Sequence, residues 1–273
     1  MILFVATLEQ WFWHTWDNLW RLVGWNLVLL AAAVPLLLPS PPLGRAVWLV
    51  MVMGPLFTGT IAWAWPMTDD RSPDLRDLLR ALRGVWLRAA GLWALAVIAA
   101  AFLNLNVLFY LGPSGQEMLG QWPSLMLAGI TVWVGALLVI AFLWTNVSLA
   151  ELRDEGRRSL KDALKLGARI LLVHPFLSVA AFLTLVLFEV VMVWTQVGMI
   201  LIGLAGAAVF LATSVREMYF AAEEKAEAAA KEERGDAKPS SWKEIMRDEQ
   251  AGGHRGRRPR RSLKEIIKPW EMD

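Results

Sequence analysis

Few side chains in this sequence have the chemistry that catalysis or metal binding requires. No Cys occurs among the 273 residues, which excludes disulfides, thiolate metal sites and cysteine nucleophiles. The His residues are far apart in the sequence, at His14, His174 and His254. There is no HExxH motif, phosphate-binding loop, dinucleotide fingerprint or nucleophile elbow. The sequence therefore predicts a protein that is not an enzyme and binds no metal or cofactor.

A few polar side chains interrupt long apolar segments, and these form the candidate site. Glu189 is the most prominent, because an ionisable group inside a membrane helix is costly and often marks a functional site. An offset of 85 residues takes Asn104 to Glu189. We therefore predict a polar cluster at one depth, formed by Asn104, Asn106, Glu189 and Gln196. Hydrogen bonding between helices would explain these residues equally well, and it is the favoured role of Asn26, Thr145 and Asn146.

A second candidate contact lies near the C-terminus, in a stretch rich in Arg and Gly. Its basic side chains are Arg255, Arg257, Arg258, Arg260 and Arg261. Basic clusters beside a membrane attract anionic lipid headgroups, by about 1 kcal/mol per residue. Ribosome or nucleic-acid binding has less support, because no aromatic residues alternate with the Arg residues.

The composition identifies the elements that must position these residues as membrane helices. Hydrophobic residues make up 56% of the chain and charged residues 19%, with 16 Trp against 2 Tyr. Soluble domains have about 45–50% apolar and about 25% charged residues. A water-soluble globule of this size has too little interior for so many apolar side chains. The sequence therefore predicts an all-α, polytopic membrane protein.

Six long gaps between charged residues locate the spans. Each gap is long enough for a helix to cross a bilayer, which takes about 20 apolar residues. The predicted spans are residues 19–39, 46–66, 87–111, 124–150, 170–192 and 197–217. Residues 1–18 form a Trp-rich segment that we expect at the membrane interface, and residues 220–273 form a charged tail.

The positions of Lys and Arg predict the orientation. Basic residues are concentrated between the second and third spans, between the fourth and fifth spans, and after the sixth. The other connections contain Arg45 as their basic residue. Both termini are therefore predicted to be cytoplasmic.

The two basic connections each contain a predicted amphipathic helix, at residues 72–82 and 158–168. Leu residues recur three or four positions apart in each, which suits a helix lying on the inner membrane surface. The 85-residue offset aligns them without a gap, taking Asp77 to Asp162 and Arg80 to Lys165. We interpret this match as a parallel internal repeat built from the second and third spans and again from the fourth and fifth.

The tail is predicted to begin as a helix and then to lose regular structure. Residues 220–234 are rich in Ala, Glu and Lys, so they should extend the sixth span as an exposed helix. The following segment is polar and partly disordered, with short helix starts at SWKEIM (241–246) and SLKEII (262–267).

Residues 16–220 resemble the YesL-like family of bacterial polytopic membrane proteins, whose function is unknown. The matching residues are Asn18–Trp20, Asn26–Leu27, Pro35, Gly54–Pro55 with Thr58, and the segments Asp74–Arg83 and Ser159–Gly167. The resemblance implies a location in the bacterial inner membrane and an association with carbohydrate uptake. The long charged tail departs from the family pattern.

Three functional hypotheses follow from these features. The leading one is a non-enzymatic, transport-associated membrane component that contacts a transporter or ATPase subunit through its cytoplasmic helices and tail. The second is a secondary transporter with a site between the two repeats. The third is a membrane assembly or ribosome-tethering factor that uses the Arg-rich tail.

Overall fold

The computed structural model describes residues 2–69, 73–151, 159–196, 198 and 202–233. All of the regular elements in these ranges are helices. In chain order, the elements before the first long hairpin are α1 (Ile2–Asp17), α2 (Leu19–Leu37), α3 (Pro42–Trp48), η1 (Leu49–Met53), α4 (Gly54–Ala64) and η2 (Trp65–Asp69). They are followed by α5 (Leu75–Leu111), α6 (Pro113–Leu119), α7 (Gln121–Glu151), α8 (Leu160–Val173), α9 (Pro175–Thr195) and α11 (Gly203–Glu233). The all-helical class predicted from composition is confirmed for the described residues.

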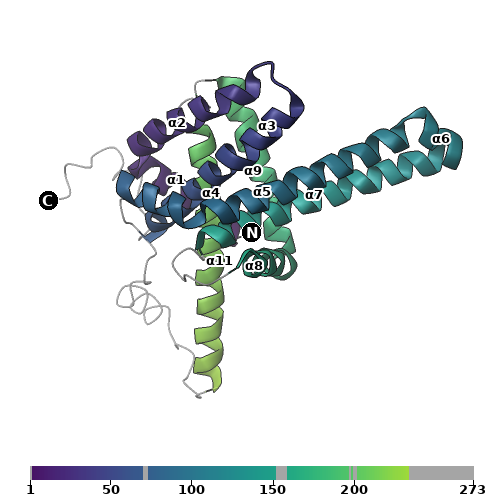
Figure 1. The fold of residues 1–273 in the computed structure, drawn as a ribbon. Coiled ribbons are helices and arrows are strands. Elements are labelled where there is room, and N and C mark those ends of the chain that lie inside the picture. Colours follow the sequence, from purple (N-terminus) through teal and green to yellow (C-terminus); the bar gives the residue numbers. More distant parts are fainter. Residues whose placement is uncertain (1, 70–72, 152–158, 197, 199–201, 234–273) are drawn as a thin grey trace.

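Helix α11 is the centre of the bundle. Its N-terminal half is buried on every side, with Ala205, Ala208, Val209, Ala212 and Val215 fully inaccessible. Helices α1, α2, α4 and α9 pack around it, and its C-terminal half continues away from the bundle (Figure 1). The small Ala and Gly side chains of α11 allow its neighbours to approach closely, which is how helices associate where the hydrophobic effect is weak.

Helix α1 packs on this central helix. The Trp11 indole N–H donates to the Gly206 carbonyl at 3.1 Å, and the Trp11 ring meets Phe188 and Phe210 edge-on. Trp13 and His14 are also buried. The segment predicted to lie at the interface is therefore a packed helix of the bundle, although its depth relative to a membrane stays a prediction.

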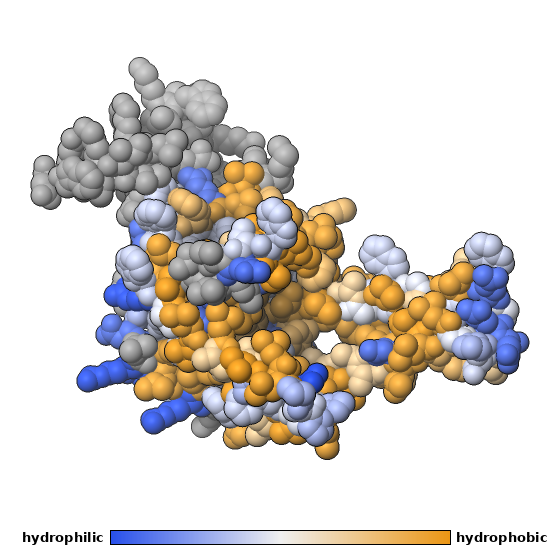
Figure 2. All heavy atoms as spheres, turned by 90° about the horizontal axis from the view of Figure 1, so that it is seen from above, coloured by the Kyte–Doolittle hydropathy of each residue, from blue (hydrophilic) through white to orange (hydrophobic). Residues whose placement is uncertain are grey.

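Helices α5 and α7 form a hairpin that leaves the bundle. We define the arm as residues 94–138, which comprise the C-terminal half of α5, the short α6 and the N-terminal half of α7. The two arm helices run side by side away from all other helices, with α6 at the far end (Figure 1). Apolar residues cover the arm along its length, and hydrophilic residues gather at its tip (Figure 2). Residues 94–111 alone measure about 27 Å along the helix axis at 1.5 Å per residue.

Five helical segments are long and apolar enough to cross a membrane. They are Leu19–Leu37, Pro42–Thr68, Arg76–Leu111, Gln121–Glu151 and Pro175–Thr195. They overlap the first five predicted spans. The fifth begins at Pro175 and not at residue 170, because α8 extends to Val173 and the helix breaks before the proline. The sixth predicted span falls on α11, which is outside this group because Arg216, Glu217 and the charged continuation lower its hydropathy. The chain therefore has the features of a multi-pass membrane protein, and the sixth span stays a prediction.

The first amphipathic segment differs from its prediction. Residues 75–111 form one unbroken helix, so the predicted surface helix at 72–82 and the predicted span at 87–111 belong to a single element, α5. No Pro separates them, and Gly84 is tolerated inside the helix. The second amphipathic segment is a separate helix, α8, which ends at Val173 before Pro175.

Helices α5 and α8 nevertheless start alike. The Asp77 carboxylate accepts the Asp74 backbone N–H at 3.0 Å, and the Asp162 carboxylate accepts the Ser159 backbone N–H at 2.9 Å. Each is an acidic residue at the third helical position that satisfies a donor at the helix start. The two starts lie at the 85-residue offset, while the internal repeat itself stays a prediction.

Candidate functional site

The four residues of the predicted polar cluster lie in different parts of the molecule. Asn104 and Asn106 belong to the arm, where Asn104 is exposed and the Asn106 amide donates to the Phe102 carbonyl of its own helix at 2.7 Å. Glu189 lies in α9, whose neighbours include α11 and α8. Gln196 ends α9 with a φ of 52° and is exposed. The two Asn residues are thus on the arm, which projects from the bundle that contains α9 (Figure 1).

Two other Asn residues bind neighbouring helices, as their favoured role predicts. The Asn26 side-chain oxygen accepts the Ala205 backbone N–H at 3.1 Å. Ala205 lies in the first turn of α11, where backbone donors have no partner within the helix. Asn26 therefore caps the central helix from α2, and this contact joins residues 179 positions apart.

Asn146 joins three helices at the base of the arm. Its side-chain oxygen is 2.6 Å from the Thr58 hydroxyl of α4 and accepts the Trp93 indole N–H of α5 at 3.2 Å. Its amide donates to the Phe142 carbonyl at 2.9 Å. Asn146 is fully buried, so these bonds satisfy a group that would otherwise be costly to place there.

Glycines allow this close packing. A Cβ on Gly54 would overlap the Trp93 ring, and one on Gly59 would overlap the Leu82 side chain. A Cβ on Gly167 of α8 would lie 2.8 Å from the Thr145 backbone nitrogen. At the base of the arm, α5 thus packs closely on α4, and α7 packs closely on α8.

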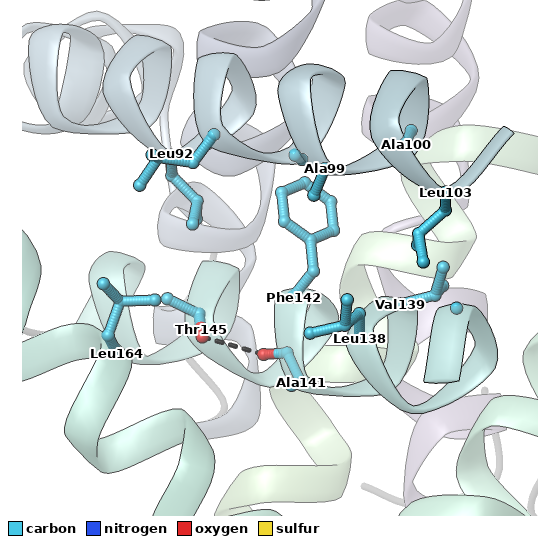
Figure 3. A pocket seen from close by; sticks show the side chains of 13 residues that line it. Leu92, Ala99, Ala100, Leu103, Leu138, Val139, Ala141, Phe142, Thr145 and Leu164 are labelled. Atoms are coloured by element: carbon cyan, nitrogen blue, oxygen red, sulfur yellow. Dashed lines mark hydrogen bonds between the residues drawn. The ribbon is translucent and has the colours of Figure 1, made fainter. Parts of the chain in front are cut away.

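An apolar groove runs from this base along the arm, between α5 and α7. Its volume is about 300 Å³. The α5 wall consists of Leu92, Leu95, Ala96, Ala99, Ala100 and Leu103. The α7 wall consists of Gly135, Leu138, Val139, Ala141, Phe142 and Thr145, and Leu164 of α8 closes the base (Figure 3).

The groove presents almost no polar atoms. Thr145 is the hydroxyl residue among its described lining residues, and the Thr145 Oγ1 donates to the Ala141 carbonyl at 2.8 Å (Figure 3). Among the residues that the structure describes, no charged side chain lines the groove. Such a surface favours hydrocarbon over any polar substrate, because a polar ligand would lose its hydration without gaining hydrogen bonds.

A second hollow, of about 480 Å³, lies between α2 and the start of α5. Its aromatic residues include Trp25 and Trp63, whose indole N–H groups already donate to the Thr60 hydroxyl and the Asp74 carbonyl. The Arg21 guanidinium donates to the Asn18 side chain at 3.2 Å. These hydrogen bonds hold α2 against α4 and the start of α5, so we assign this hollow a structural role.

No family model, curated protein or solved structure matches the chain. The resemblance to the YesL-like family therefore stays a prediction. Within the described ranges, no three His, Asp or Glu side chains come close enough to hold a metal ion. The five Arg residues of the tail lie outside the described residues.

The groove was not among the sequence predictions, although a signal for it exists. Ala96, Ala99 and Ala100 recur on one face of α5, and Gly135 lies on the facing side of α7. Small residues at helical spacing indicate where two membrane helices approach closely or leave a furrow. The pattern contains no polar residue, so a search for polar side chains inside apolar segments does not find it.

Proposed function

We propose that the chain is a transport-associated membrane component that carries out no reaction itself and binds another membrane subunit through its arm. The supporting observation is a row of exposed residues on the outer face of α7: Trp122 (76% exposed), Met126 (71%), Gly129 and Trp133 (72%). We call this row the α7 stripe. Its spacings of four, three and four residues put all four positions on one face of the helix.

The α7 stripe has the shape of a helix-packing surface. No atom of the described residues lies within 4 Å of a Cβ built on Gly129, so this part of the chain leaves open space above the stripe at its centre. Large side chains on either side of a glycine form a notch into which a second helix can pack closely. Trp and Met are also residues that protein interfaces favour.

Mild-detergent purification of the tagged chain tests the proposal. The full chain should retain a second membrane protein, and Gly129→Leu should reduce its recovery at least fivefold by filling the notch. Gly24→Leu is the matched control, since Gly24 of α2 is also exposed with nothing within 4 Å. Equal recovery with both variants would contradict a docking role for the arm.

The identity of the retained protein distinguishes the hypotheses. A transporter or ATPase subunit would support the transport-associated role, whereas ribosomal proteins would support tethering through the Arg-rich tail. Absence of any partner would favour the secondary transporter. The similar helix starts at Asp74 and Ser159 support that alternative, because they are what an internal repeat would produce.

The proposed orientation places both termini in the cytoplasm. One contact supports it: the Tyr219 hydroxyl donates to the Glu151 carboxylate at 2.8 Å. Glu151 precedes the basic connection at 152–158, and Tyr219 precedes the tail, so both lie at one end of the bundle. Reporter fusions near residues 70, 156 and 240 should give cytoplasmic signals, and fusions near 43, 115 and 195 external ones. An external signal at 156 would contradict the orientation.

A further inference from the structure

Basic side chains stand at the bundle end of the apolar groove. Arg88 precedes Leu92 by one turn on the face of α5 that lines the groove, and its guanidinium donates to the Gly84 carbonyl at 2.6 Å. This bond directs the positive charge away from the arm, toward the start of α5. The charge therefore stands just beyond the last apolar residues of the groove.

Helix α8 brings a second group of positive charges to the same end. Its Leu160 side chain lies 3.7 Å from a Cβ built on Gly91, so the first turn of α8 packs on α5 between Arg88 and Leu92. Lys161 and Lys165 follow on the exposed side of α8, next to Leu164, which lines the groove. An anion at this end would meet charges from two helices.

The length of the groove matches one leaflet of a bilayer. From Leu92 to Leu103 the α5 wall rises about 17 Å at 1.5 Å per residue. Half of a typical hydrocarbon core is about 15 Å. An acyl chain of one leaflet would thus fit along the length of the groove.

We propose that the groove binds one anionic phospholipid, with an acyl chain between α5 and α7 and the phosphate beside Arg88, Lys161 and Lys165. The apolar walls select hydrocarbon, and the basic end selects a negative headgroup. A soluble anion would use only the basic end, and a neutral lipid only the groove. The site faces away from the α7 stripe, because its α7 residues lie about half a turn around the helix from Gly129 and Trp133. The lipid site is therefore independent of partner binding by the arm.

Native mass spectrometry of the full chain in mild detergent provides the test. Phosphatidylglycerol and phosphatidylcholine with identical acyl chains are titrated separately. We expect one phosphatidylglycerol per chain to bind at least tenfold more tightly than phosphatidylcholine. Equal affinity for the two lipids would overturn the proposal, as would a chain that retains a second protein copy in place of lipid.

Two pairs of variants locate the bound lipid. Ala99→Phe fills the groove and should reduce phosphatidylglycerol binding at least tenfold, while Ala101→Phe places the same ring on the opposite, exposed face of α5 and should leave binding unchanged. Arg88→Gln should weaken binding about fivefold, the factor for 1 kcal/mol per basic residue. Arg83→Gln on the opposite face is its control. Equal losses within either pair would overturn the assignment.

A measurement on the unaltered chain covers the case in which a variant fails to fold. Phosphatidylglycerol with a photoactivatable group near the end of its acyl chain should label peptides that contain residues 95–103 or 135–142. Labelling confined to α2 or α9, whose lipid-facing side chains are also apolar, would contradict the site.

Discussion

Helices α5 and α8 begin with the same local structure, but the apolar segments that follow them take different routes. Each starts with an acidic residue at the third helical position that accepts the cap backbone N–H. After α8, the chain breaks at His174, and α9 packs on α11. At the equivalent point, Ala89 and Ala90 keep α5 helical, and its C-terminal half becomes the arm. Pro175 stands where α5 has Ala90, counted at the 85-residue offset.

Pro175 allows a break before α9, and packing on α11 then holds α9 in its new direction. Proline lacks a backbone N–H and its ring collides with the carbonyl four residues earlier, so a helix readily ends before it. The break lets α9 change direction and cover α11. Without a break, α5 continues as one helix beyond the bundle, and α7 packs against it to form the arm.

The largest effect is expected from Ala90→Pro, which gives α5 the proline of α9. Ala90 is buried, so the variant should lose at least about 3 kcal/mol of stability. The arm should also change direction. Spin labels at Leu79 and Leu105, both exposed, should lie about 39 Å apart in the straight helix and clearly closer in the variant.

The equivalent label pair, Leu164 and Val190, measures the broken helix and is also exposed. In the unaltered chain, the distance between labels at Leu164 and Val190 should be shorter than the distance between labels at Leu79 and Leu105. Pro175→Ala should leave it unchanged, because packing on α11 holds α9 in place. A lengthened distance in that variant would mean that the proline alone sets the route of α9.

A smaller loss is expected where helices pack through glycine. Gly167→Ala should cost about 2–3 kcal/mol, because its new methyl group meets the Thr145 backbone, which cannot move aside. Gly59→Ala should cost about 1 kcal/mol or less, because the Leu82 side chain can rotate and alanine favours the helix. Denaturation in mixed micelles measures both. The reverse order would show that α8 is held more loosely than α5.

The buried polar contacts should rank next. Asn146→Ala removes the acceptor shared by Thr58 and Trp93 and should cost about 1–2 kcal/mol. Asn106→Ala, on the arm, breaks only a bond to its own helix and should change stability by less than about 0.5 kcal/mol. Similar losses at both positions would indicate that the arm is packed as firmly as the bundle.

The smallest effects are expected at the two helix starts. Asp162→Ala should cost about 1 kcal/mol, because Asp162 accepts both the Ser159 backbone N–H and its hydroxyl at 2.9 Å. Asp77→Ala should cost slightly less, because at the cap the Asp77 carboxylate accepts the Asp74 backbone N–H without a side-chain hydroxyl beside it. Thermal unfolding measures the stability of both variants. A clear loss of stability in only one of them would argue against equivalent roles for Asp77 and Asp162.

The sequence was informative wherever charge and capping decide the structure. Gaps between charged residues located five apolar helices, and the amphipathic helix predicted at 158–168 overlaps α8. The prediction at 72–82 was less accurate, because α5 begins at Leu75, with Asp74 as its cap, and continues to Leu111. The two Asn residues with the favoured helix-contact role, Asn26 and Asn146, do contact other helices.

Other features depend on tertiary contacts that no local pattern records. Residues 72–82 have an amphipathic pattern and residues 87–111 an apolar one. This change of pattern suggests two helices, but it is equally compatible with one continuous helix, so the sequence did not reveal that α5 is unbroken. Hydropathy also cannot distinguish a helix surrounded by lipid from one surrounded by protein. The central position of α11 was therefore not predictable, nor was the groove, which needs Leu164 of α8 beside α5 and α7.

The position of α11 at the centre has a consequence for the order of assembly during translation. Trp11 and Asn26 bind Gly206 and Ala205, so these contacts span 195 and 179 residues. At about 5–20 residues per second, a ribosome needs roughly 10–40 s to synthesise the intervening chain. During that interval α1, α2 and α4 have no central helix to pack on, whereas the arm can close as soon as α7 emerges. Slowed elongation before Gly203 should therefore increase proteolysis of the nascent bundle while leaving the α5–α7 hairpin protected.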